Sequence, residues 1–197
     1  MKKIMFDDKF GLTQAVLEGR KTMTRRFLKQ NYESVSCMNV NYEDHWHGEL
    51  DGETFELLPR FQVGETVAIA QSYSNIFDEA DKGDYFADCY EAFRQIIAVD
   101  TPGWKNKMFV RADVMPHHIR ITKIEIERLQ DISYGDCIKE GVIKNGSWRP
   151  YNFALAGFKE WFETPVQAFA ALIDKVSGKG TWERNPWVFA YSFERID

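Results

Sequence analysis

A short basic segment near the N-terminus carries the residues best suited to chemistry. The segment "LEGRKTMTRR" covers residues 17–26 and includes Gly19, a typical helix stop. Its cations and hydroxyl side chains are Arg20, Lys21, Thr22, Thr24, Arg25 and Arg26. Arginine and lysine bind phosphate and carboxylate groups, and threonine adds hydrogen bonds. Because hydroxyl groups and a helix end accompany the charges, the pattern favours an anion-binding surface over a solvated charge run.

Thr24 and Lys21 together offer the parts of a nucleophilic site. A threonine hydroxyl is a weak nucleophile and needs an adjacent base. Lys21 lies three residues before Thr24, so a turn or an extended loop could bring the two groups together. Lysine acts as a base only when burial or neighbouring positive charge lowers its pKa. The adjacent arginines favour that lowering, whereas a nearby carboxylate would oppose it, and the sequence leaves the balance open.

Glu140 is the candidate acid partner of this site. It lies directly before Gly141, at the end of the segment "SYGDCIKEGV". Its carboxylate could orient the lysine, carry a proton or bind a leaving amine. A glutamate near the C-terminal end of a helix is also an ordinary surface residue, slightly unfavourable to the helix dipole. Composition and spacing alone do not decide between these roles.

The same basic segment also permits binding without covalent chemistry. Its cations would hold phosphates, the threonines would add hydrogen bonds, and an aromatic ring would stack on a base. The stacking candidates are Trp104, Tyr73 and Trp148. This interpretation predicts a ligand of the RNA or modified-nucleoside class.

We expect neither a metal ion nor a cofactor. His45, His47 and Cys37 lie close in sequence, but no second ligand pair follows at zinc-finger or knuckle spacing. The "SGKG" segment at residues 177–180 lacks the GxxxxGK[ST] pattern of a phosphate loop and predicts a helix end followed by a turn.

Alternating and helical patterns predict the elements that position these residues. Helices are expected at residues 7–18, 134–140 and 164–177. Thr164, Pro165 and Gln167 form a capping box at the third helix, with a predicted apolar stripe of Val166, Phe169, Ile173 and Val176.

Strands are expected at residues 63–70, 108–111, 118–127 and 186–195. The break in alternation near Thr122 and Lys123 predicts a bend or bulge in the third of them. The aromatic face of the last strand predicts core packing for Trp187, Phe189, Tyr191 and Phe193. Together these helices and strands predict an α+β fold. Their order along the chain fits a small closed or half-closed barrel with peripheral helices better than alternating βαβ units.

Composition narrows the class of protein. The 197 residues carry 44% hydrophobic residues and a net charge of −5, which argues against sequence-blind binding to duplex DNA. No apolar run is long enough for a membrane helix, and the N-terminus lacks the apolar region of a signal peptide. The three cysteines, Cys37, Cys89 and Cys137, favour reduced thiols and a cytoplasmic location.

Four blocks of the chain together resemble the ASCH family of PUA-like β-barrel domains, which occurs in bacteria and phages. The blocks are Leu17 to Arg26, Val63-Gly64-Glu65, Ile119 to Gly141 and Asn185 to Ile196. The resemblance implies a single PUA-like domain over residues 1–197, a small mixed barrel with peripheral helices. Residues 30–60 and 72–116, which lack a sustained period, would be insertions. PUA-like domains are generally associated with RNA or modified bases.

Two blocks are also similar to the small bacterial N4-acetylcytidine amidohydrolases. The Gly-Arg-Lys-Thr-x-Thr segment of those enzymes aligns its proposed catalytic lysine with Lys21 and its second threonine with Thr24. A gapless match of residues 129–142 places their glutamate at Glu140. Arg26 belongs instead to the longer, phage-type pattern.

Three functional hypotheses follow. The first is an amidohydrolase that acts on an acylated cytidine-type base through Lys21, Thr24 and Glu140. The second is a module that binds RNA or a modified nucleoside through Arg20, Thr22, Arg25 and Arg26 without turnover. The third is a phage-derived accessory protein that binds another protein.

Overall fold

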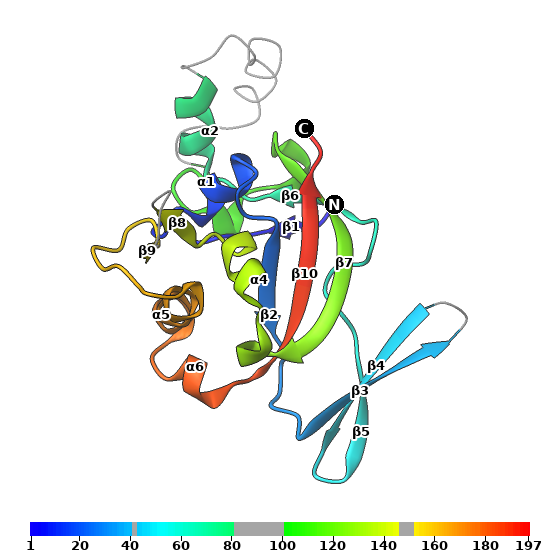
Figure 1. Cartoon of the computed structure of the whole chain (residues 1–197). Coiled ribbons are helices and arrows are strands. Elements are labelled where there is room, and N and C mark those ends of the chain that lie inside the picture. Colours follow the sequence, from blue (N-terminus) through cyan, green and yellow to red (C-terminus); the bar gives the residue numbers. More distant parts are fainter. Residues whose placement is uncertain (41–42, 81–100, 146–151) are drawn as a thin grey trace.

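The computed structural model describes residues 1–40, 43–80, 101–145 and 152–197. Its centre is a five-stranded sheet with the strand order β1-β6-β7-β10-β2. Figure 1 shows this sheet with helices gathered along its β2 side and a smaller sheet extending below it. The strands of the central sheet are β1 (Lys3–Ile4), β2 (Met23–Phe27), β6 (Thr66–Ile69), β7 (His118–Arg128) and β10 (Trp187–Arg195).

The central sheet is mixed and open. Strand β1 runs parallel to β6, and the remaining pairs are antiparallel. Within the described residues, β1 and β2 are the two edges of the sheet, so the ladder does not close into a barrel. The predicted α+β class is therefore confirmed at the level of mixed sheets and helices.

Strands β7 and β10 form the middle of the sheet, and both follow their sequence patterns. Ile119 and Ile121 are fully buried, as the alternation predicts. Ser192 opposes Lys123 while Phe193 opposes Ile121, which leaves Thr122 as the extra residue of a bulge. The predicted bulge near Thr122 is thus confirmed.

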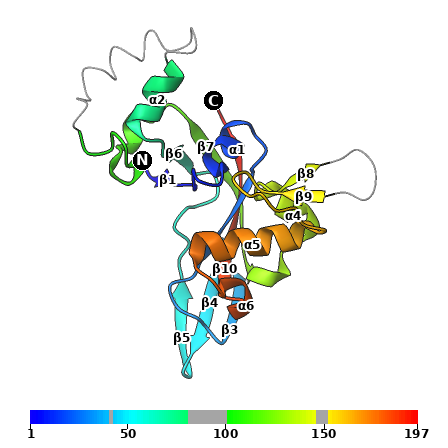
Figure 2. The same cartoon turned by 90° about the vertical axis from the view of Figure 1, so that its left-hand side faces the viewer.

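Helices α4, α5 and α6 lie along the β2 side of the sheet (Figure 2). Helix α4 (Tyr134–Lys139) begins at Ser133, whose hydroxyl accepts from the Asp136 amide. Helix α5 (Pro165–Ser177) begins with the predicted capping box of Thr164 and Gln167. Helix α6 (Thr181–Arg184) follows after a short turn.

The buried face of α5 differs from the predicted stripe. Phe169 and Ile173 are buried, but Val176 is 43% exposed. Ala168 and Leu172 take its place against the core. Helices α4 and α6 and strand β9 (Asn152–Ala154) contact α5, and its buried face is set by this packing in addition to its own periodicity.

The first predicted helix is shorter than expected. Helix α1 spans Leu12–Leu17, and Gly11 before it is left-handed with a φ of 62°. A turn in which the Gly11 amide donates to the Asp8 carbonyl occupies the start of the predicted range. Glycine adopts this conformation without a steric penalty, so the helix cannot extend backwards through it.

The strand predicted at residues 108–111 is wrong. The segment contains the 3-10 helix Lys107–Phe109, where the Asn106 side chain accepts from the Met108 amide. A side chain that caps the backbone locally competes with a strand ladder. A second 3-10 helix, Ala112–Val114, follows, and a third, Leu129–Asp131, connects β7 to α4.

Residues 30–60 contain a separate antiparallel sheet, which we call the arm sheet. It consists of β3 (Ser34–Val40), β4 (Glu43–Leu50) and β5 (Glu53–Leu57) and lies to the lower right in Figure 1. Trp46 packs edge-on against Phe189 of the central sheet, with ring centroids 5.8 Å apart.

The remaining elements are peripheral. Helix α2 (Tyr73–Ala80) lies at the top of Figure 1, and β8 (Ile143–Asn145) pairs with β9 (Asn152–Ala154). No helix of the described ranges is both long and apolar enough to cross a membrane.

Candidate functional site

The centre of the site is an ion pair between Lys21 and Glu140. The Lys21 Nζ donates to the Glu140 carboxylate at 2.5 Å and to the Glu140 carbonyl at 2.8 Å. Both side chains are almost completely buried, at 2% and 5% exposed. The two residues are 119 positions apart, and the fold brings them together between the end of α1 and the end of α4.

Backbone hydrogen bonds hold the two segments in place. The Lys21 amide donates to the Ala15 carbonyl, which ends α1. The Thr22 amide donates to the Lys139 carbonyl and so joins this segment to the last turn of α4. Gly141 follows Glu140 with a φ of 107°, a conformation that favours glycine.

Arg25 is the second partner of Glu140. Its Nη1 donates to Glu140 Oε1 at 3.0 Å, and its Nε donates to Glu127 Oε1 at 2.7 Å. The Arg25 side chain is 1% exposed. The guanidinium therefore holds Glu140 and Glu127 in position.

Burial lowers the pKa of Lys21. The loss of solvation is the largest cause, and the charges of Arg26 and Arg25 act in the same direction. The Glu140 carboxylate raises the pKa of Lys21, but this effect does not overcome burial. The structure thus resolves the balance that the sequence leaves open, and it favours proton release from the ammonium relative to an exposed lysine.

Thr24 lies beside this pair, on β2. Its side chain is buried, and it lines a cavity of about 190 Å³ that Lys21 and Glu140 also line. The three predicted catalytic residues therefore share one cavity. Apolar side chains complete the walls, including Phe6 and residues of α5 such as Phe169, Leu172 and Ile173.

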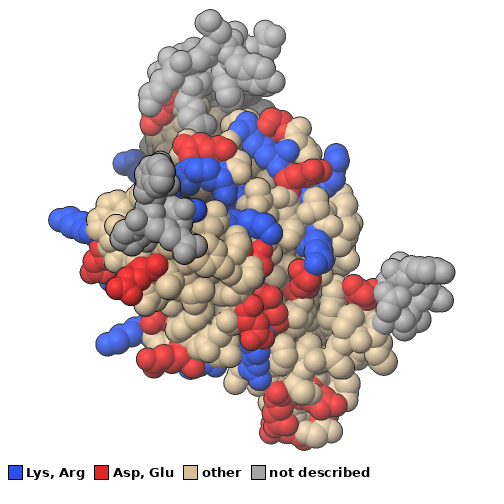
Figure 3. All heavy atoms as spheres, viewed as in Figure 1, with Lys and Arg blue, Asp and Glu red and all other residues tan. Residues whose placement is uncertain are grey.

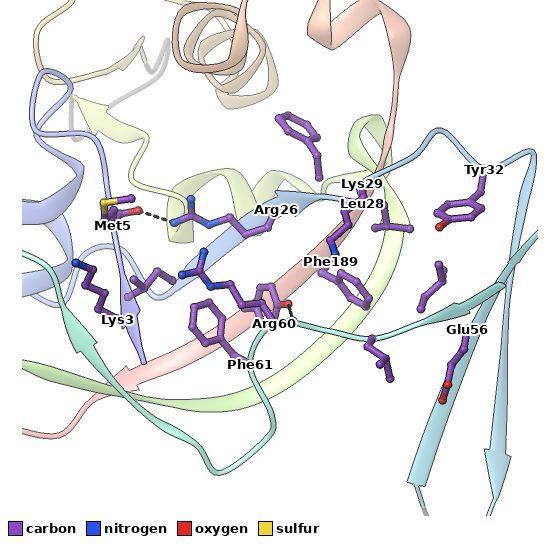
Figure 4. A pocket seen from close by; sticks show the side chains of 15 residues that line it. Lys3, Met5, Arg26, Leu28, Lys29, Tyr32, Glu56, Arg60, Phe61 and Phe189 are labelled. Carbon is purple, nitrogen blue, oxygen red and sulfur yellow. Dashed lines mark hydrogen bonds between the residues drawn. The ribbon is translucent and has the colours of Figure 1, made fainter. Parts of the chain in front are cut away.

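A second, larger cavity of about 450 Å³ adjoins the first (Figure 4). Its volume falls within the range of sites that hold small molecules. Its lining combines cations with aromatic rings. The charged and aromatic members are Lys3, Arg26, Phe27, Lys29, Tyr32, Glu56, Arg60, Phe61, Phe189 and Tyr191.

Three residues form part of the lining of both cavities. Met5, Arg26 and Phe27 line both. The Arg26 Nη2 donates to the Met5 carbonyl at 2.6 Å, as the dashed line in Figure 4 marks. Thr24 and Arg26 of β2 oppose Tyr191 and Phe189 of β10. Strand β2 borders both cavities, and its Phe27 also lines both.

Two of the predicted ligand-binding residues lie elsewhere. Arg20 is exposed and pairs with Glu18, with 2.6 Å between Nη2 and the carboxylate. Thr22 lines neither cavity, and its backbone bonds to Lys139 and Phe193. Of the predicted cations, Arg26 lines both cavities, whereas Arg25 lines the smaller one as an ion-paired group.

None of the predicted stacking residues that the structure describes lines either cavity. Tyr73 is 2% exposed in a second core cluster, and Trp104 packs against Phe77 there. Trp148 lies outside the described residues. Among the described residues, no group of three His, Cys, Asp or Glu side chains could hold a metal ion, and Cys37 and Cys137 are free thiols.

The sequence patterns missed most of the larger cavity. Lys3 lies in a two-residue strand, and Arg60 lies in the connection between β5 and β6. Neither belongs to a motif, and only their shared position around Arg26 relates them. Phe189 and Tyr191 were predicted as core, and they are buried, but they also form a wall of this cavity.

Comparison with known proteins finds no match to this chain. The chain matches no protein-family model, no curated protein and no solved structure. Functional inference therefore depends on the geometry of the two cavities and on the resemblance of individual sequence blocks.

Proposed function

We propose that this protein binds a nucleoside, or one nucleotide of an RNA, in the two adjoining cavities. The observation that carries the proposal is the lining of the larger cavity, which places cations and aromatic rings around one space of about 450 Å³. Aromatic rings accept bases by stacking, and cations accept the phosphates of the backbone. The resemblance to ASCH domains supports the same ligand class. It also implies a PUA-like barrel, which we propose in its half-closed form because the described sheet has two edges.

Binding is tested at Arg26, the cation shared by the cavities. Arg26→Gln should weaken binding of a short RNA or of N4-acetylcytidine at least about tenfold, measured by calorimetry, because a charge-assisted hydrogen bond contributes about 1.5–3 kcal/mol. Arg120→Gln is the matched control, since Arg120 is exposed on β7 and lies in neither cavity. An affinity that does not change in Arg26→Gln would contradict the proposal.

A second candidate, amide hydrolysis, is favoured by the arrangement of Lys21, Thr24 and Glu140 in the smaller cavity. The Thr24 hydroxyl would attack the acyl carbonyl while its proton passes to Lys21, which would act as the base in its unprotonated form. The carbon–nitrogen bond would then break as Lys21 returns the proton to the leaving amine. Water would hydrolyse the threonyl ester, release the acid and restore the hydroxyl.

The support for this reaction is the environment of Lys21. Its lowered pKa suits a base, and Glu140 fixes the position of its Nζ. The cavity is largely apolar, which strengthens electrostatic interactions with a developing oxyanion.

Turnover is tested by incubation with N4-acetylcytidine and chromatographic detection of cytidine. Thr24→Val should abolish release, since it removes the hydroxyl and preserves the shape of the side chain. Thr22→Val is the control, because Thr22 lies outside both cavities. If the wild type releases no cytidine while it binds the nucleoside, the protein is a binding module and the catalytic candidate fails.

A further inference from the structure

We propose that Arg26, Arg60 and Lys3 form a phosphate subsite in the larger cavity, so that the ligand is a nucleotide and not an uncharged nucleoside. The inference deepens the proposed function, because it names the ligand class of the same site. Figure 4 shows the guanidinium groups of Arg26 and Arg60 side by side, with Lys3 on the same side of the pocket and Glu56 at the opposite end.

Arg60 brings an unpaired charge to this cluster. Within the described residues, no carboxylate forms an ion pair with its guanidinium. Its backbone is fixed at both ends, since its amide donates to the Tyr191 hydroxyl at 3.0 Å and its carbonyl accepts from Lys2 at 2.8 Å. The guanidinium of Arg60 lies over the Phe61 ring, 5.4 Å from its centroid, in a cation–π contact.

Arg26 contributes a buried donor that lacks a partner. Its Nη2 donates to the Met5 carbonyl, but its Nε is buried without an acceptor in the described part of the chain. A buried N–H group without a partner destabilises the protein, and a ligand oxygen that accepts from it would remove this cost. A phosphate offers several acceptor oxygens and fits the fork of a guanidinium.

Lys3 adds a third charge. Its Nζ donates to the carbonyls of Met108 and Val110 at 2.7 and 2.5 Å, which leaves one of its three N–H groups for a ligand. Burial is the main cause of the lowered pKa values of Lys3 and Arg26, and the positive charge of Arg60 lowers both further. A phosphate anion bound among these three cations would reduce their mutual repulsion.

The shared lining relates this subsite to the smaller cavity. Arg26 borders both spaces, so a phosphate bound at Arg26 and Arg60 would lie beside a residue that also lines the cavity of the Lys21–Glu140 pair. The source of the phosphate is either a free nucleotide or an RNA chain, and both present anionic phosphate oxygens to these residues.

The subsite is tested by calorimetry at constant ionic strength with cytidine, cytidine 5′-monophosphate, inorganic phosphate and a short RNA. The monophosphate should bind at least about tenfold more tightly than cytidine. Arg60→Gln should weaken binding of the monophosphate more than binding of cytidine and so remove this difference, and Arg60→Lys should restore part of it. Arg120→Gln should behave as wild type, since Arg120 is distant from the cavity lining. Tighter binding of the RNA with the same dependence on Arg60 would identify a phosphodiester as the natural group.

The outcomes separate this inference from the proposed function. Equal affinities for cytidine and its monophosphate would overturn the subsite and keep nucleoside binding. Inorganic phosphate binding that depends on Arg60, without binding of any nucleoside or RNA, would support the subsite and overturn the proposed function. Arg60 is exposed and its side chain has no ion pair in the described chain, so the variants are expected to fold, which thermal unfolding checks.

Discussion

At the scale of single residues, Glu140 is the most constrained side chain of the site. It accepts from Lys21 through one oxygen and from Arg25 through the other. Each partner is buried, so neither cation has water to replace the carboxylate. Removal of one member of a buried pair is costly because it leaves an uncompensated charge in a medium of low polarity.

Glu140→Gln should therefore lower the free energy of unfolding by about 3 kcal/mol. Urea unfolding measures the loss. Glu125→Gln is the control, because Glu125 forms a similar pair with Lys123 at 2.7 Å but is 47% exposed. Exposed pairs contribute about 1 kcal/mol or less. Equal losses in the two variants would show that the buried network does not stabilise the fold.

Lys21 gives the stability of the protein a specific pH dependence. Burial lowers its pKa below that of the unfolded chain, so the unfolded state binds more protons between the two values. The contribution of Lys21 to the free energy of unfolding therefore rises with pH in that window, which ends near the unfolded lysine pKa of about 10.4. In Lys21→Met this rise should disappear, and the stability of the wild type relative to the variant should increase toward alkaline pH. A difference that is constant with pH would contradict the lowered pKa.

At the scale of elements, α5 forms one wall of the smaller cavity. Its start is determined locally, since the Thr164 side chain accepts from the Gln167 amide and the Gln167 side chain accepts from the Thr164 amide. Phe169 then lies 5.9 Å from the Arg25 guanidinium, which links the helix to the ion-pair network. The position of the helix thus influences both the cavity and the network.

Thr164→Ala should destabilise the protein by about 1 kcal/mol, the usual cost of losing an N-cap side chain. Thermal or urea unfolding measures the change. Ser177→Ala, at the other end of the helix, is the matched control because no hydrogen bond of the Ser177 hydroxyl is found in the described chain, and it should change stability by less than about 0.5 kcal/mol. A neutral Thr164→Ala would mean that packing alone determines where α5 begins.

At the scale of the whole molecule, the arm sheet is coupled to the larger cavity. The Trp187 indole donates to the Tyr32 carbonyl at 3.0 Å, and the Tyr32 ring lines the cavity. Gly48 of β4 lies against that ring, since a Cβ at this position would be 2.5 Å from Tyr32 Cδ1. Figure 3 shows the arm sheet ending in a group of acidic side chains, while Lys and Arg are interspersed with acids over the rest of this face.

Gly48→Ala should displace Tyr32, reduce ligand affinity in the larger cavity and cost about 1–3 kcal/mol of stability by overpacking. Calorimetry and urea unfolding measure the two effects. The control is Gly135→Ala in α4, where the nearest atom to a new Cβ is 3.8 Å away. Unchanged affinity in Gly48→Ala would show that the arm sheet is independent of the site.

Sequence alone determined the features that depend on neighbouring residues. The capping box at Thr164 and the bulge at Thr122 are both present as predicted. Each arises from interactions within a few residues or from one strand's own alternation, which the sequence displays directly. The strand predicted at residues 108–111 failed because the Asn106 cap outweighs a weak β pattern.

Only the tertiary structure decided which side chains share a cavity. The contact between Lys21 and Glu140, 119 residues apart, depends on the end of α4 packing against the end of α1. Likewise, Lys3 and Arg60 line one cavity with Arg26 although β1 and β2 are opposite edges of the sheet and Arg60 lies between β5 and β6, while Arg20 turns to the surface. Spacing along the chain does not encode such contacts, since strand order and burial determine which distant groups meet and which charges lose water.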